Sequence, residues 1–270
     1  MLLSGRYELG PALPFALSQG TTFQGRCVAT NAPVVLLYPQ VPRASDDVLR
    51  RCVEAAQREH GPDAVRVLGW ARDPRGDRPV LALEPPLGES LAAVIRGRVP
   101  LGLEHALWVA GELLTALEQA HAAGRTVGPL APEDLLVVGE GQGWRLRRVP
   151  RLELSDPSLG MPGGVATRVA ALPPELLDNA LNQSVATDVF AVGMLLYELL
   201  SGGRLPVEGK TTRDIIMKVL QGRGAHIVEH RPDLPAHVST AIQRAIRPEP
   251  KDRPPSAAAL RAALSGPQPV

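Results

Sequence analysis

The patterning of the chain changes from strand-type to helix-type along its length, and this change constrains the fold more than any other feature. In the first 84 residues, short apolar runs are separated by turns such as Asn31-Ala32-Pro33. Beyond residue 89, apolar residues recur at helical spacing, as they do from Leu103 to Ala123. A mostly-β segment followed by a mostly-helical one predicts an α+β fold of two lobes. We expect the lobes at residues 1–84 and 85–265, with a linker starting at 266–270.

Local signals predict where the individual elements lie. Alternating or continuous apolar runs bounded by turns predict strands, and apolar stripes with capping residues predict helices. The expected strands are 7–9, 22–29, 34–38, 65–70 and 79–84, with a hairpin at 135–146; the expected helices are 45–59, 103–123, 185–201, 212–221, 235–246 and 256–264; residues 151–172 are expected to form a loop.

Composition excludes several classes of partner. The chain has 270 residues, 44% of them hydrophobic, and a formal net charge of +1, which favours neither nucleic acid nor an acidic membrane. The apolar stretch Val189–Leu200 is too short to span a bilayer, and the N-terminus does not resemble a signal peptide. Cys27 and Cys52 lack metal-type spacing. We therefore expect a cytoplasmic domain without membrane contact, metal ligands or a disulfide.

Three motifs in the second half of the chain have the order and spacing of motifs in a known protein family. They are Leu172-Pro173-Pro174-Glu175, the run from Asp188 to Gly202, and the segment from Arg247 to Pro254. Together they resemble the C-terminal lobe of bacterial Ser/Thr protein kinases. The resemblance implies a bilobal protein-kinase-like fold, with a small β-rich N-lobe that holds one helix and a larger α-helical C-lobe.

The resemblance also implies structural roles for three charged residues. Glu175 and Arg253 would form a buried ion pair that ties the activation segment to the last helices. Asp188 would accept hydrogen bonds from backbone N–H groups of the catalytic-loop region.

The positions that carry catalysis in kinases hold other residues in this chain. Leu37 stands in place of the strand lysine, and Pro129 in place of the catalytic aspartate. Asp134 replaces the metal-binding asparagine, and Arg148 replaces the metal-binding aspartate. The segment Leu13–Gly20 has one glycine where the glycine-rich loop has three.

The segment that corresponds to the kinase hinge also departs from the family. It is Glu84-Pro85-Pro86, whose two prolines have no N–H to offer a nucleotide base.

These departures predict a catalytically inactive pseudokinase, not an enzyme, with no cofactor. The predicted role is a protein-interaction or scaffolding module in bacterial signalling, with an active Ser/Thr kinase, a phosphopeptide reader or a second copy of the chain as partner. The alternative is a ligand sensor or an atypical enzyme that uses the inter-lobe cleft. Arg147, Arg148 and Arg151 would then bind a phosphate-bearing ligand.

Overall fold

The structure is a computed structural model that divides the chain into two compact units. It describes residues 1–40, 43–58, 64–85, 88–95, 100–138, 145–150, 168–178 and 182–266. The first unit comprises the described residues of Met1–Leu91 and Pro132–Thr167, and the second those of Ala92–Ala131 and Arg168–Val270.

The units divide at other points than the lobes expected from the sequence. The first unit runs on to Leu91, beyond the expected boundary at residue 84, and it also includes the segment from Pro132. That segment forms strands that pair with residues 89–90, and its Leu136 and Val149 lie in the core of the first unit. A contact between distant segments, which no local pattern reports, therefore sets the division.

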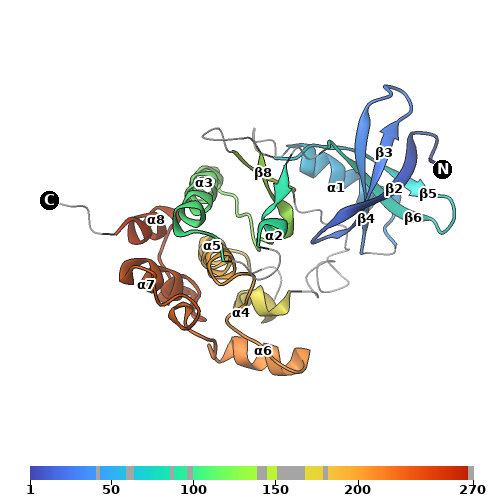
Figure 1. Cartoon of the computed structure of the whole chain (residues 1–270). Coiled ribbons are helices and arrows are strands. Elements are labelled where there is room, and N and C mark those ends of the chain that lie inside the picture. Colours follow the sequence, from blue (N-terminus) through green and yellow to red (C-terminus); the bar gives the residue numbers. More distant parts are fainter. Residues whose placement is uncertain are drawn as a thin grey trace. The chain divides into compact units, whose positions relative to one another are not determined.

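The first unit is built on a six-stranded antiparallel sheet with one long helix beside it (Figure 1). The strand order is β1-β2-β3-β4-β6-β5, and a smaller sheet has the order β7-β8-β9. The elements are β1 (Leu2–Leu3), β2 (Tyr7–Leu17), β3 (Gly20–Cys27), β4 (Pro33–Pro39), α1 (Asp46–Arg58), β5 (Val67–Asp73), β6 (Arg78–Leu83), β7 (Glu89–Ser90), β8 (Leu135–Val138) and β9 (Arg145–Arg148).

Strand β2 extends well beyond the expected residues 7–9, through the segment compared above with a glycine-rich loop. Its neighbour β1 pairs with Tyr7 and Glu8, and among the described residues no other strand lies along that edge in the rest of β2. Pro11 and Pro14 lie in this part, where a missing N–H is tolerated. The pairing of β2 with β3 shifts register between Leu9 and Ala12 and again before Ala16. The prolines therefore loosen the strand without ending it.

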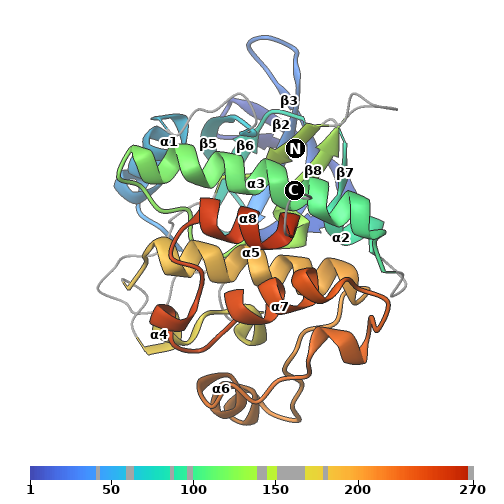
Figure 2. The same ribbon diagram turned by 90° about the vertical axis from the view of Figure 1, so that its left-hand side faces the viewer.

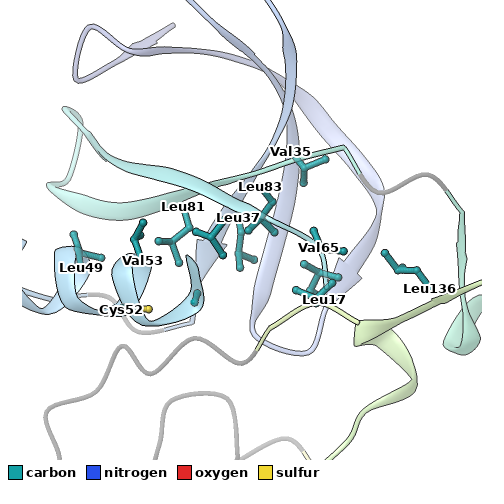
Figure 3. Packing of buried hydrophobic residues seen from close by; sticks show 13 residues of the cluster. Leu17, Val35, Leu37, Leu49, Cys52, Val53, Val65, Leu81, Leu83 and Leu136 are labelled. Atoms are coloured by element: carbon teal, nitrogen blue, oxygen red, sulfur yellow. The ribbon is translucent and has the colours of Figure 1, made fainter. Parts of the chain in front are cut away.

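Both faces of β4 are buried, which explains its continuous apolar run. Val34, Leu36 and Tyr38 pack on one face with residues of β1 and β6. On the other face, Leu37 is fully buried in a cluster that also contains Leu83 (Figure 3). The cluster joins β4 to α1, β5, β6 and the end of β2, and its buried members are Leu17, Val35, Leu37, Leu49, Cys52, Val53, Ala56, Val65, Val67, Leu81, Leu83, Leu136 and Val149.

The second unit is helical and surrounds one buried helix. Helix α5 contacts α3, α7 and α8, and these helices lie side by side in Figure 2. Every residue of α5 from Thr187 to Leu200 is buried. Helix α2 (Leu91–Val94) lies at the boundary between the units, and the helices that follow are α3 (Leu103–Ala122), α4 (Pro174–Asp178), α5 (Val185–Leu200), α6 (Thr212–Leu220), α7 (Ala236–Ala245) and α8 (Ala257–Ser265).

Local chemistry fixes the start and the packing of α5. Ser184 caps the helix and forms a capping box with Thr187. At Gly193, a Cβ atom would lie 2.5 Å from the Cβ of Ala245 in α7, so the two helices approach too closely for a side chain there. This glycine therefore sets the distance between α5 and α7.

The expected α+β class is confirmed, with a β-rich N-terminal region followed by a helical part. The long helices begin and end within one or two residues of the bounds expected from the sequence. In the described ranges, no helix combines the length and the apolar character that a bilayer span requires.

We expect Leu37→Ala to lower the free energy of unfolding by about 2–5 kcal/mol, because it removes buried methyl groups and leaves a cavity in the cluster. The matched control is Leu68→Ala on β5, since the Leu68 side chain is 40% exposed. The control should change stability by less than about 1 kcal/mol. Urea denaturation measures both variants, and equal losses would contradict this assignment of the core.

Candidate functional site

A buried carboxylate on α5 holds the backbone that precedes Pro129. Asp188 is fully buried, and its carboxylate accepts hydrogen bonds from the backbone N–H of Val127 at 2.9 Å and of Gly128 at 2.6 Å. The Nε2 atom of His121 lies 2.8 Å from the same carboxylate. Gly128 has a φ of 81°, which favours glycine. The backbone directly before Pro129, the residue that the sequence analysis compared with the catalytic aspartate, is therefore held firmly.

A second buried charge pair anchors the segment that contains Glu175. Arg253 donates from Nη1 to Glu175 Oε1 at 2.7 Å and from Nη2 to Oε2 at 2.8 Å, and its side chain is fully buried. It also donates to the backbone carbonyls of Ala186, Arg247 and Pro248. The guanidinium lies over the ring of Phe190, 4.7 Å from the centroid. All parts of this cation thus contact groups that offset its desolvation.

The pair lowers the pKa of Glu175. Burial alone raises this pKa, but the hydrogen bonds from Arg253, supported by Thr187, outweigh it, so the pKa lies below its ordinary value. The carboxylate therefore remains charged at neutral pH, and the ion pair persists.

In the first unit, Asp134 contacts the turn between β2 and β3. It ends a short 3-10 turn, Pro132–Asp134, directly before β8. Its Oδ1 accepts the backbone N–H of Ser18 at 2.9 Å, and its Oδ2 accepts the hydroxyl of Ser18. Next to this contact, the side-chain amide of Gln19 donates to the carbonyl of Pro150 at 3.1 Å. The turn at residues 18–19 is thus held at two points.

Leu37 and Arg148 lie in different surroundings within the same unit. Leu37 belongs to the apolar cluster of Figure 3 together with Val149, the residue after Arg148. Arg148 pairs with Leu135 in the hairpin of β8 and β9, and its carbonyl accepts the N–H of Val65 at 2.8 Å. The structure thus brings Asp134 and Arg148 to the same, open end of one short hairpin.

Arg147 was a candidate anion ligand, and the structure pairs it with a carboxylate. Its guanidinium donates to Glu84 and to the carbonyl of Ala64. Glu84 also accepts the backbone N–H and the side chain of Arg66, each at 2.9 Å. Burial raises the pKa of Glu84, but the hydrogen bonds from Arg66 and Arg147 lower it by more than burial raises it. The pKa of Glu84 therefore lies below its ordinary value. Arg151 lies outside the described residues.

The contacts of Ser18, Gln19 and Glu84 were missed by the sequence analysis. Ser18 and Asp134 are separated by 116 residues, and Gln19 and Pro150 by 131. No periodicity or short motif reports a hydrogen bond over such a distance. Only Asp134 had a signal, because it falls at a position that the family resemblance marks.

Comparison with solved structures defines the fold. The kinase domain of PknI from Mycobacterium tuberculosis, solved as a double mutant, superposes with a TM-score of 0.71 at 18% sequence identity over 98% of this chain and 96% of that chain. Rad53 residues 1–466 in complex with AMP-PNP give a TM-score of 0.71 at 18% identity, over 95% of this chain and 64% of that one. The chain therefore has the bilobal protein-kinase-like fold.

Sequence comparison relates the chain to bacterial Ser/Thr kinases. Residues 155–264 match the family model of protein tyrosine and serine/threonine kinases. The chain is 26% identical over 261 residues to the serine/threonine-protein kinase pkn3 of Myxococcus xanthus, covering 91% of this chain and 47% of that protein. It is 28% identical over 166 residues to the probable serine/threonine-protein kinase PknB of Lactococcus lactis, covering 62% of this chain and 26% of that protein. The chain thus spans half or less of the length of these relatives.

These relatives contradict the predicted function. The chain was expected to be an inactive pseudokinase with a scaffolding role and no enzyme activity, and the proteins it resembles are named Ser/Thr protein kinases. The same finding argues against the alternative of a ligand sensor or an atypical enzyme. The error has a physical origin: the prediction equated four changed side chains with lost chemistry. Phosphoryl transfer depends mainly on positioning and charge, which other side chains can supply.

We expect Arg253→Ala to lower the free energy of unfolding by about 3–5 kcal/mol, because it leaves the carboxylate of Glu175 without its counter-charge. The matched control is Arg247→Ala, an exposed arginine six residues earlier. The control should change stability by no more than about 0.5 kcal/mol. Chemical denaturation at pH 7 compares the two variants, and a loss below about 1 kcal/mol for Arg253→Ala would contradict the anchoring role.

The stability difference between the wild type and Glu175→Gln should depend on pH. The pKa of Glu175 is lowered in the folded state, so the unfolded chain takes up the proton first as the pH falls. The advantage of the wild type is therefore complete above the ordinary pKa of 4.5 and shrinks as the pH falls through the folded value. Denaturation of both proteins between pH 7 and pH 3 measures this, and a difference that does not vary with pH would refute it.

Proposed function

We propose that this chain acts as a protein-kinase-type domain that transfers the γ-phosphoryl group of ATP to Ser or Thr hydroxyl groups of proteins. The observation that carries the proposal is the clamp of Asp188 on Val127 and Gly128. A fully buried carboxylate is hydrogen-bonded to one short backbone segment. We compare this segment with the catalytic loop of the named relatives. Precise placement of reacting groups is the main source of catalysis in phosphoryl transfer.

Asp134 is the group of this chain that we propose to hold the metal ion. Mg²⁺ is typically bound by one or two carboxylates together with the phosphates of a nucleotide. In the part of the chain that the structure describes, no three His, Cys, Asp or Glu side chains gather to hold a metal without such help. The carboxylate of Asp134 therefore fits a metal that arrives with ATP. When bound, the ion would neutralise charge on the phosphate oxygens.

The reaction we propose needs little proton chemistry from the protein. The bond between the γ-phosphorus and the oxygen that bridges it to the β-phosphate breaks, and ADP leaves with that oxygen and the bonding electron pair. The substrate hydroxyl oxygen bonds to the phosphorus, and the hydroxyl proton passes to solvent. The transition state of this reaction is loose, so a general base contributes less than positioning does. That Leu37, Pro129 and Arg148 supply no catalytic group stays our prediction. The expected turnover is below the range of about 1–100 s⁻¹ that is typical of kinases.

The relatives are named as protein kinases, so we propose that this chain acts on or binds a protein. An experiment has to identify that protein. An active Ser/Thr kinase and a second copy of the chain are both candidates, since each presents Ser and Thr hydroxyl groups in loops. The cytoplasmic location also stays a prediction.

We expect the purified chain to transfer labelled phosphate from ATP to a mixed protein substrate when Mg²⁺ or Mn²⁺ is present. Asp134→Ala should lower the rate at least about tenfold, because it removes the carboxylate. Asp134→Asn keeps an oxygen ligand and should retain part of the rate. The measurement is the initial rate of label incorporation for all proteins under identical conditions.

The matched control is Asp77→Ala, which removes an 84% exposed carboxylate from a turn of the same unit. This variant should transfer phosphate at the wild-type rate. Absence of transfer by the wild type with both metals would overturn the proposed function. A rate that is equal in the wild type and in Asp134→Ala would overturn the role of Asp134.

A further inference from the structure

The tip of the β2–β3 hairpin covers the carboxylate that the proposed function requires. Ser18 uses both its N–H and its hydroxyl on Asp134, one for each carboxylate oxygen. Hydrogen bonds to an ionised carboxylate are stronger than those between neutral groups. A phosphate group or a cation that approaches Asp134 from the side of the hairpin therefore meets Ser18 first.

A second contact fixes the same tip. Gln19 is 8% exposed, and its side-chain amide donates to the carbonyl of Pro150, beyond the end of β9. The carbonyl of Gln19 accepts the N–H of Gln40 at 3.0 Å. Ser18 and Gln19 thus bind the two chain segments at the open end of the β8–β9 hairpin, one before its first strand and one after its second.

The polar contacts of the turn act on a hairpin whose pairing is uneven. Leu17, just before the turn, is buried in the apolar cluster and forms a fixed point, and Ala16 and Leu17 pair with Thr21 and Gly20. Farther from the tip, two register shifts between Leu9 and Ala16 interrupt the pairing of β2 with β3. A strand with fewer ladder hydrogen bonds opens locally at lower cost than a regular one. Ser18 and Gln19 lie in the turn itself, and their contacts with Asp134 and Pro150 fix it against the β8–β9 hairpin.

We propose that Ser18 and Gln19 form an autoinhibitory latch, in which the tip of the β2–β3 hairpin is closed over Asp134 and must open before a nucleotide phosphate reaches that carboxylate. The consequence for activity rests on the proposed function, whereas the latch itself is a property of the first unit alone. A latch of this kind lowers the apparent affinity for a ligand by the fraction of molecules that are open. Weakening the latch therefore raises activity when ATP is below saturation.

Hydrogen exchange tests the latch without reference to activity. We expect the amide of residue 18 to exchange about tenfold faster or more in Ser18→Ala, because the variant loses a hydrogen bond to a charged group. Ser18→Asp should accelerate exchange further, since it places a second carboxylate against Asp134. The amide of Gln40, which donates to Gln19, should follow the same order.

The matched control is Ser4→Ala, at the turn between β1 and β2. The hydroxyl of Ser4 accepts the N–H of Arg72 at 2.8 Å, so this variant should accelerate exchange at Arg72 and leave residue 18 unchanged. Unchanged exchange at residue 18 in both Ser18 variants would overturn the latch. The latch would also be overturned if Ser4→Ala accelerated exchange at residue 18 as much as Ser18→Ala does.

Phosphate transfer at low ATP concentration then separates the two proposals. Faster exchange together with a several-fold higher initial rate in Ser18→Ala supports the latch as an inhibitory contact. Faster exchange with no transfer by any variant would overturn the proposed function and leave the closed hairpin established as a structural contact. Faster exchange with an unchanged rate would overturn the inhibitory role while leaving the proposed function intact.

Discussion

The second unit depends on one fully buried carboxylate. A carboxylate away from water is costly unless it is hydrogen-bonded, and Asp188 has Val127, Gly128 and His121 as partners. These partners all belong to the end of α3 or to the segment after it, so the charge of Asp188 fixes that segment against the start of α5. Because α5 contacts α3, α7 and α8, the same residue links the packing of the unit to the placement of the segment that holds Val127 and Gly128.

The first unit relies on apolar packing around Leu37, the residue that the sequence analysis compared with the strand lysine of kinases. Leu37 is fully buried among leucine and valine side chains. Polar contacts of the unit include Ser18 with Asp134, Arg147 with Glu84, and the buried Asp73, which accepts the hydroxyl of Tyr38.

Local signals in the sequence predicted the long helices well, because their apolar stripes and capping residues act within a few turns. The same signals made β2 too short: the strand runs to Leu17, and its prolines lie in a stretch with one edge along which no described strand runs. Local signals also carry no information on the pairing of β7 with β8, which joins residues more than forty positions apart. For function, the sequence identified the fold, but the relatives contradict the predicted inactivity, which was inferred from the changed residues taken together.

The sequence by itself determined the α+β class, the helical second part and the residues at the family's marked positions. These features follow from hydrophobic periodicity, capping and short motifs, all of which are local. Only the tertiary structure decided which groups those residues contact: that Asp134 binds the tip of the β2–β3 hairpin, and that Glu84 holds Arg147. Such contacts join residues that lie 116 and 63 positions apart. They are set by how the whole chain packs, so no pattern of neighbouring residues encodes them.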